Sequence, residues 1–146
     1  MRQALDRAYD ACQIGEIPVG ALIVFEGAII ASGFNQKERE QCSTKHAEIL
    51  AIEEASRHLQ NFRLLNCDMY VTLEPCLMCA GALYQARIRK VFFGAHDPKA
   101  GALGSLYSIH QDSRLNHRFE AEGGILTQES QTLLKDFFQK RRKHAK

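Results

Sequence analysis

The sequence predicts an α/β domain in which helices cover a mixed sheet. One observation is the order of segments, in which strand-like runs alternate with helical ones along most of the 146 residues. A second is composition: 45% hydrophobic and 25% charged residues are typical of one folded domain with a substantial core, here residues 1–146. A third is that no run of about 18 apolar residues occurs, so we expect no membrane span.

The first half of the chain predicts a helix, a strand hairpin and a second helix. These elements cover residues 2–13, 19–25, 28–34 and about 45–58. Apolar residues at helical spacing indicate the helices, and apolar, β-branched runs indicate the strands. Glu26–Gly27 suits a tight turn between the two strands. Ser43 or Thr44 can cap the second helix.

The second half predicts three more strands and two more helices. The strands cover 68–73, 91–93 and 118–121, and the helices cover about 76–87 and 126–142. Pro75 favours a helix start, because proline suits the first helical turn. The connection 94–117 is rich in Gly, Ala and Ser, with a short helix expected near 102–110. A loop of this length in a compact domain is usually functional.

One histidine and two cysteines form the clearest candidate site. His46 begins one predicted helix, and Cys76 and Cys79 lie three apart, on one side of a turn at the start of another. This is the ligand set of a catalytic zinc whose fourth position is left to water. The sequence therefore predicts one Zn²⁺ per subunit, held by His46, Cys76 and Cys79. The positive ends of both helices would face the thiolates.

Glu48 is the predicted proton carrier of this site. It lies two residues after His46, and a carboxylate there can move protons during hydrolysis, the work of a general acid–base. His-x-Glu followed by Pro-Cys-x-x-Cys is the signature of zinc nucleobase deaminases. A Cys-x-x-Cys alone is as often structural zinc or redox chemistry, and a structural site needs a fourth protein ligand. The available candidates are Cys42, Cys67, His58 and His96.

Cysteine count and charge bear on compartment and partners. Five cysteines and the lack of an export signal in the first 15 residues indicate a reducing cytoplasm with free or metal-bound thiols. The net charge is only +2, but residues 135–146 carry six Lys or Arg against one acid. This basic end favours an anionic partner such as nucleic acid, unless it is merely a solvated terminus.

Two longer segments carry a family resemblance. Val71–Ala82 and Phe93–Ser105 resemble the bacterial tRNA adenosine deaminases, which convert the wobble adenosine of an anticodon to inosine. Further matching segments are Pro18–Ala21, Phe34–Asn35, Asn116–Arg118, Gly124–Leu126 and the Phe137-Phe138 and Arg141-Arg142 pairs. The resemblance thus covers nearly the whole chain. The metal motif alone resembles the deaminase superfamily in general. The Phe93–Ser105 segment and the C-terminal Phe-Phe and Arg-Arg pairs make the resemblance specific to the tRNA-editing branch.

The resemblance implies a fold and partners. The fold is a three-layer α/β/α sandwich, cytidine-deaminase-like, with about five strands in a mixed sheet and the last strands parallel. The implied partners are a tRNA anticodon stem-loop and a second copy of the chain in a homodimer. A single-stranded loop suits an enzyme of this kind, because its bases can be turned outward and bound in a pocket.

The resemblance also implies residue roles. It makes His46, Cys76 and Cys79 the zinc ligands and Glu48 the proton shuttle. The implied substrate contacts are Asn35 at the target base, Asp97 near the flipped nucleotide's sugar, and Phe137, Arg141 and Arg142 near the anticodon loop. Plainer roles stay open: Asn35 could cap a strand end, Asp97 could form a turn with Pro98, and one of Phe137 and Phe138 is expected in the core. At position 96 this chain has a histidine, where the family it resembles commonly has an arginine.

Two other functions share parts of this pattern. A small-molecule deaminase acting on guanine, cytosine or a nucleotide could use the same zinc motif, although the basic end and the Gly-rich loop disfavour it. A non-catalytic, zinc-stabilised RNA-binding subunit is the second alternative, and Glu48 speaks against it.

Overall fold

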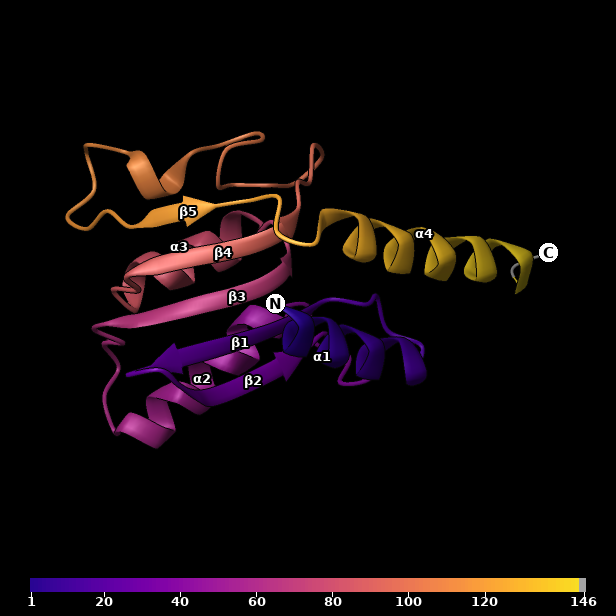
Figure 1. The fold of residues 1–146 in the computed structure, drawn as a ribbon, viewed down its shortest axis with the longest axis horizontal. Helices are drawn as coiled ribbons and strands as arrows, with labels where there is room; N and C mark the ends of the chain where they lie inside the picture. The colour runs from indigo at the N-terminus through magenta and orange to yellow at the C-terminus, as the bar shows by residue number, and fades with distance from the viewer. Residues whose placement is uncertain (145–146) are drawn as a thin grey trace.

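Five strands form one mixed sheet in the order β2-β1-β3-β4-β5 in the computed structural model, which describes residues 1–144 (Figure 1). The strands are β1 (Gly20–Phe25), β2 (Ala28–Phe34), β3 (Cys67–Leu73), β4 (Lys90–Ala95) and β5 (Glu120–Glu122). Strand β1 pairs antiparallel with β2 and β3, whereas β3, β4 and β5 run parallel. The predicted mixed sheet with parallel last strands is confirmed.

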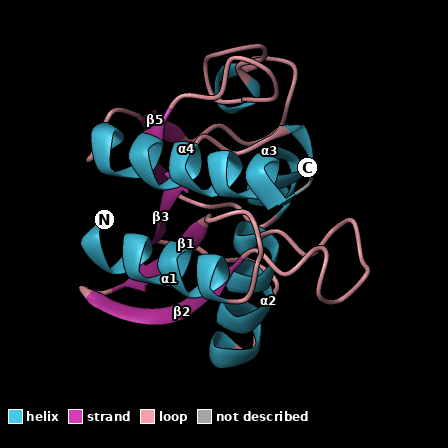
Figure 2. Ribbon diagram, turned by 90° about the vertical axis from the view of Figure 1, so that its right-hand side faces the viewer, coloured by secondary structure: helices cyan, strands magenta, loops and turns pink. Residues whose placement is uncertain are grey.

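Two pairs of helices cover the two faces of the sheet (Figures 1 and 2). Helices α1 (Arg2–Gln13) and α4 (Thr127–His144) share one face, and α2 (Ala47–Leu59) and α3 (Leu77–Gln85) share the other. A 3₁₀ turn, η1 (Ile109–Gln111), lies in the connection between β4 and β5. The three-layer α/β/α sandwich is therefore confirmed.

Small residues allow the helices to lie close against the sheet. Helix α2 buries Ala47, Ala51 and Ala55 on the side that faces the sheet. A side chain at Gly33 of β2 would place its Cβ 2.5 Å from the Ala47 carbonyl oxygen and 3.0 Å from the Ala51 nitrogen. Because real Cβ atoms do not approach backbone this closely, Gly33 sets the depth at which the N-terminal turn of α2 docks. That turn carries part of the candidate site.

Helix α2 begins later than predicted, and its cap differs. It starts at Ala47 with His46 as the N-cap residue, and no side chain caps it, so the predicted Ser43 or Thr44 cap is wrong. The backbone explains the difference: the Lys45 N–H donates to the Cys42 carbonyl, and the Lys45 carbonyl accepts from Gln36 N–H at 3.0 Å. These bonds form a turn over residues 42–45, and His46 after it is extended (φ −79°, ψ 154°), so the helix starts only at Ala47.

The long connection after β4 contains less helix than predicted. A short helix was expected near 102–110, but only the η1 turn forms. The N–H groups of Leu103 and Ser105 donate instead to the side chain of Glu74, each at 3.0 Å, so they are unavailable to a helix. Strand β5 is also shifted from the predicted 118–121, because Glu120–Glu122 pair with Lys90–Phe92 of β4.

The remaining differences are at the ends of elements. Strand β4 extends beyond the predicted 91–93, and α4 continues to His144. Residues 145–146 of the predicted basic end lie outside the described residues. Within residues 1–144, no helix combines the length and the apolar character that crossing a membrane requires.

Candidate active site

The three predicted metal ligands meet where two helices begin. His46 is the N-cap residue of α2, Cys76 is the N-cap residue of α3, and Cys79 lies in the first turn of α3. The Nδ1 atom of His46 lies 3.7 Å from Sγ of Cys76 and 3.5 Å from Sγ of Cys79. All three ligand atoms lie within 4.8 Å of one another. The predicted convergence of the two helix starts is therefore found in the structure.

The spacing and chemistry of these atoms fit a tetrahedral zinc ion. Zn–N bonds of about 2.0–2.1 Å and Zn–S bonds of about 2.3 Å place N and S about 3.5 Å apart at a tetrahedral angle. Both observed N–S separations lie close to this value. Among residues 1–144, no fourth Cys, His, Asp or Glu joins the group. The three side chains could thus hold a metal with one position open, the arrangement of catalytic rather than structural sites.

The candidates for a fourth protein ligand have other surroundings. Cys67 is fully buried, and its thiol lies 3.7 Å from the Leu65 carbonyl oxygen. The Cys42 thiol contacts the Thr44 hydroxyl at 3.3 Å on the surface. His96 contacts Glu74 rather than the cysteines. All five cysteines are free thiols.

The two cysteine thiols differ strongly in acidity. A hydrogen bond with Cys79, followed by one with His46, lowers the pKa of Cys76 to about 4 despite its partial burial. The same bond with Cys76, together with burial, raises the pKa of Cys79. The bond with Cys76 also raises the pKa of His46. The site therefore presents a thiolate at neutral pH, the form in which cysteine binds metals.

Glu48 is buried beside this group, on the first turn of α2. It is 4% exposed and lines a cavity of about 170 Å³ together with His46 and Cys76. Burial raises the pKa of Glu48 to about 6. A carboxyl group with a pKa near neutrality can both accept and donate a proton, as a general acid–base must.

Asn35 lies in the same cavity, directly after β2. Its side-chain amide donates to the Ile17 carbonyl at 3.4 Å, and its oxygen accepts from the Lys37 N–H at 3.3 Å. Both ends of the amide are thus oriented by the backbone. An asparagine has two amide protons and two oxygen lone pairs, so one of each is left for a ligand. A strand-end cap and a ligand contact are therefore compatible here.

Asp97 also lines the cavity, from the loop after β4. Its Oδ1 atom accepts from the N–H groups of Lys99 and Ala100, at 3.1 and 3.2 Å. The turn considered for Asp97–Pro98 is present. It leaves the second carboxylate oxygen of Asp97 free of these two bonds.

The structure separates the three predicted contacts on α4 from this cavity. Phe137 is only 8% exposed, whereas Phe138 is 37% exposed. The expectation that one of the pair belongs to the core is confirmed, and the buried Phe137 ring is disfavoured as a surface for stacking. Arg141 donates to the Glu38 carboxylate at 2.5 Å and to the Gly15 carbonyl at 3.1 Å. Arg142 is exposed.

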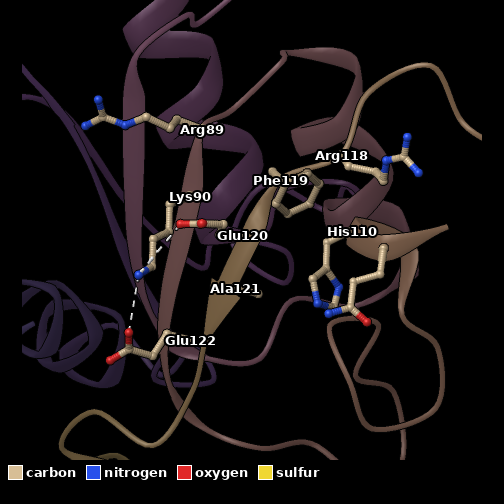
Figure 3. Close-up of a pocket in the computed structure, with 9 residues that line it drawn as sticks. Arg89, Lys90, His110, Arg118, Phe119, Glu120, Ala121 and Glu122 are labelled. Atoms are coloured by element: carbon tan, nitrogen blue, oxygen red, sulfur yellow. Dashed lines mark hydrogen bonds and ion pairs between the residues drawn. The ribbon is translucent and has the colours of Figure 1, made fainter. Parts of the chain in front are cut away.

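A larger cavity, of about 590 Å³, lies beside β5 (Figure 3). Of the described residues that line it, none is a predicted site residue. Its charged groups are largely paired: Lys90 contacts Glu122 at 3.3 Å and Glu120 at 4.0 Å, as the dashed lines show (Figure 3), and Arg89 donates twice to Asp68. The Nδ1 atom of His110, which also lines this cavity, is buried without a hydrogen-bond partner among the described residues.

Two charged residues that line the cavity were missed by reasoning from the sequence, namely Lys37 and Glu74. Lys37 lies two residues after Asn35, in a segment that the sequence showed only as a polar loop. Glu74 lies directly before Pro75, and its position at the end of an apolar strand was a usable signal. Few acidic side chains are fully buried unless they have partners.

Fold and site together define the class of protein. An α/β/α sandwich with one histidine and two cysteines at helix starts, beside a buried glutamate, is the arrangement of nucleobase deaminases. The family model described as MafB19-like deaminase matches residues 1–142.

Individual proteins agree with this class. A tRNA-specific adenosine deaminase of Haemophilus influenzae is 46% identical over the whole of this chain and 85% of its own length. A solved tRNA:A34 deaminase structure superposes with a TM-score of 0.88 at 40% identity, over 92% of this chain and 97% of the other. A guanine deaminase of Bacillus subtilis is 41% identical over 65% of this chain and 61% of its own, with a TM-score of 0.62. The chain belongs to the MafB19-like deaminases, and within them to the family of tRNA-specific adenosine deaminases.

Proposed function

We propose that this chain, as a single deaminase domain over residues 1–146, hydrolytically deaminates adenosine to inosine at the wobble position of a tRNA anticodon. The observation that carries the proposal is that Glu48 lines one cavity with His46 and Cys76, which form the candidate metal group together with Cys79. The names of the relatives, at 40–46% identity over nearly the whole chain, support the choice of substrate.

The donor set suits Zn²⁺, one ion per subunit, bound by His46, Cys76 and Cys79. A zinc ion held there supplies Lewis acidity, which makes water a nucleophile near neutral pH. In the overall reaction a C–O bond forms at the ring carbon of adenine and its C–N bond breaks, so that water is consumed and ammonia leaves. Glu48 takes one proton from the attacking water and delivers it to the ring nitrogen. It then takes the remaining proton of that water, from the hydroxyl group on the ring carbon, and delivers it to the departing amine.

Asn35 and Asp97 are the proposed substrate contacts inside the cavity. The spare amide proton and lone pair of Asn35 would bind the edge of the base, and Asp97 would lie near the sugar of the flipped nucleotide. A cavity of about 170 Å³ is smaller than the roughly 300–1,000 Å³ of typical drug-sized ligand sites, and it suits a single extruded base.

The exposed basic side chains of α4 are the proposed contacts with the anticodon stem-loop. Arg142 and Lys143 are exposed near the end of this helix. Arg141 has a protein partner in Glu38, so a direct tRNA contact would require it to exchange that partner. We further propose a homodimer and, because the substrate is tRNA, a cytoplasmic location.

The guanine deaminase similarity favours one second candidate, a small-molecule base deaminase. A substrate panel separates the two functions. Purified protein is incubated with tRNA, an isolated anticodon stem-loop, adenosine, guanine and cytosine, each with and without a zinc chelator. The proposal expects inosine at the wobble position of tRNA, lost with the chelator, and little turnover of the free bases. Comparable turnover of a free base would show that the tRNA assignment is wrong.

A further inference from the structure

We propose that Glu74 is a positioning residue of the substrate pocket: its buried carboxylate holds the loop of residues 97–105 in the shape that places Asp97 beside the metal site. The proposal rests on the proposed function for the role of Asp97. The dependence of the loop on the Glu74 carboxylate does not rest on that function, because it is argued only from the contacts between the two.

Glu74 lies between the end of β3 and the start of α3, two residues before the metal ligand Cys76. The residue is 2% exposed, and its side chain is fully inaccessible. A buried carboxylate is costly unless its oxygen atoms accept hydrogen bonds, so the partners of this group must be part of the fold.

Four donors of one loop surround the carboxylate. Oε1 accepts from the Asp97 N–H at 3.0 Å and from the Ser105 hydroxyl. Oε2 accepts from the N–H groups of Leu103 and Ser105, each at 3.0 Å. Both ends of the 97–105 loop are therefore tied to the same side chain. His96 also approaches the carboxylate, with Nδ1 at 3.5 Å from Oε1.

Gly101 closes the loop around the same group. A Cβ at this position would overlap the Cδ and both oxygen atoms of Glu74. The Gly101 N–H donates to the Asp97 carbonyl at 2.8 Å, and Gly101 forms a backbone bridge with Cys76. The loop thus packs without a gap on the carboxylate and is linked to the backbone of a metal ligand.

Glu74 acts on the pocket through the loop. Glu74 borders the cavity, but its side chain has no exposed surface; Asp97 and Ala100 of the loop also line the cavity, with His46 and Glu48. The Asp97 side chain takes its direction from the Lys99 and Ala100 N–H groups. Loosening the carboxylate contacts would therefore move Asp97, while the Glu74 backbone N–H still donates to the Ala95 carbonyl and keeps α3 in place.

The test uses two substitutions that disturb this contact from opposite sides. Glu74→Gln replaces one acceptor oxygen with an NH₂ group that opposes N–H donors, and Gly101→Ala places a methyl group against the carboxylate. Gly81→Ala in α3 is the matched control, since a Cβ there meets nothing within 4 Å. For each variant, zinc content, kcat and KM for an anticodon stem-loop, and amide hydrogen exchange of residues 97–105 are measured.

We expect both test variants to keep zinc and to exchange the Asp97, Leu103 and Ser105 amides roughly tenfold faster or more, because buried hydrogen-bonding groups lose their partners. The KM should rise about tenfold, with a smaller effect on kcat, and Gly81→Ala should match the unmodified protein. Unchanged exchange in the loop of both variants would overturn the proposal. So would loss of zinc from Glu74→Gln with unchanged loop exchange, because the side chain would then serve the metal site. Hydrogen exchange needs no turnover, so it separates this proposal from failure of the proposed function.

Discussion

The guanidinium group of Arg141 donates to the carboxylate of Glu38 at 2.5 Å, joining the last helix to the segment that follows β2. The same guanidinium donates to the Gly15 carbonyl at 3.1 Å and lies over the Phe137 ring, 4.8 Å from its centroid. Glu38 lies three residues after Asn35, which lines the cavity. Arg141 therefore ties α4 to the segment after β2, although its side chain is 42% exposed, and its neighbour Arg142 is also exposed.

This difference predicts distinct effects for two adjacent arginines. Arg141→Ala should lower the free energy of unfolding by about 0.2–1 kcal/mol, the usual range for a partly exposed ion pair. A double-mutant cycle with Glu38→Ala should show coupling of similar size. Arg142→Ala should leave the stability unchanged within about 0.5 kcal/mol. Urea denaturation measures these values, and a double-mutant cycle that shows no coupling between Arg141 and Glu38 would contradict the stabilising role assigned to this pair.

The exposed charges of α4 should govern the electrostatic part of tRNA binding. Replacing Arg142 and Lys143 together with Ala should weaken binding of an anticodon stem-loop. It should also reduce the slope of log K against log salt by about 0.7 for each lost phosphate contact on a single strand. The measurement is a salt titration of affinity. An unchanged slope would show that these residues are only a solvated end of the helix.

Removing one of the three proposed metal ligands should abolish metal binding and activity together. Cys79→Ala leaves one nitrogen and one sulfur ligand, too few for a stable zinc site. Zinc content measured by elemental analysis should fall from one ion per chain to near zero, and inosine formation should be lost. Cys42→Ala is the matched control, because Cys42 lies on the surface away from the group. A Cys79→Ala protein that retained full zinc content would show that the ligand set is misassigned.

The packing of α1 on the sheet should depend on Gly20. A Cβ there would lie 2.5 Å from the Ala8 backbone nitrogen and would overlap the Ala4 carbonyl oxygen. Gly20→Ala should therefore destabilise the fold by about 1–3 kcal/mol, the usual cost of overpacking a core. Gly81→Ala should be neutral or stabilising by up to about 1 kcal/mol, since alanine is the better helix former. Thermal unfolding of the two variants provides the comparison. Equal stability of these variants would mean that α1 can shift on the sheet at no cost.

Much of this structure could be predicted from local patterns. The hairpin of β1 and β2 follows from two β-branched runs around Glu26–Gly27. The grouping of His46, Cys76 and Cys79 follows from short motifs in which the residue types and their spacing are set within a few positions. The start of α2 was misplaced because the loop before it is held by backbone bonds of Cys42 and Lys45, which no side-chain pattern reveals.

Contacts between distant segments were the part that could not be predicted. Glu74 is satisfied by donors 23 to 31 residues away, and Arg141 reaches Glu38 across 103 residues. The hydrogen-bond partners of both side chains lie in distant loops, so they depend on how those loops fold back onto the sheet. The sequence pattern of α4 indicated that one phenylalanine is buried, but the choice of Phe137 over Phe138 required the packed helix.

The central claim is that Glu48 moves protons for water activated at His46, Cys76 and Cys79. The most direct measurement is inosine formation in tRNA by Glu48→Gln, with zinc content and tRNA affinity determined on the same protein. Gln is nearly isosteric with Glu but cannot take up a proton at neutral pH. We expect unchanged zinc and tRNA binding with a rate at least a hundredfold lower, the typical contribution of a general acid–base. A variant that keeps zinc, binds tRNA and still forms inosine at a rate near that of the unmodified protein would contradict the account.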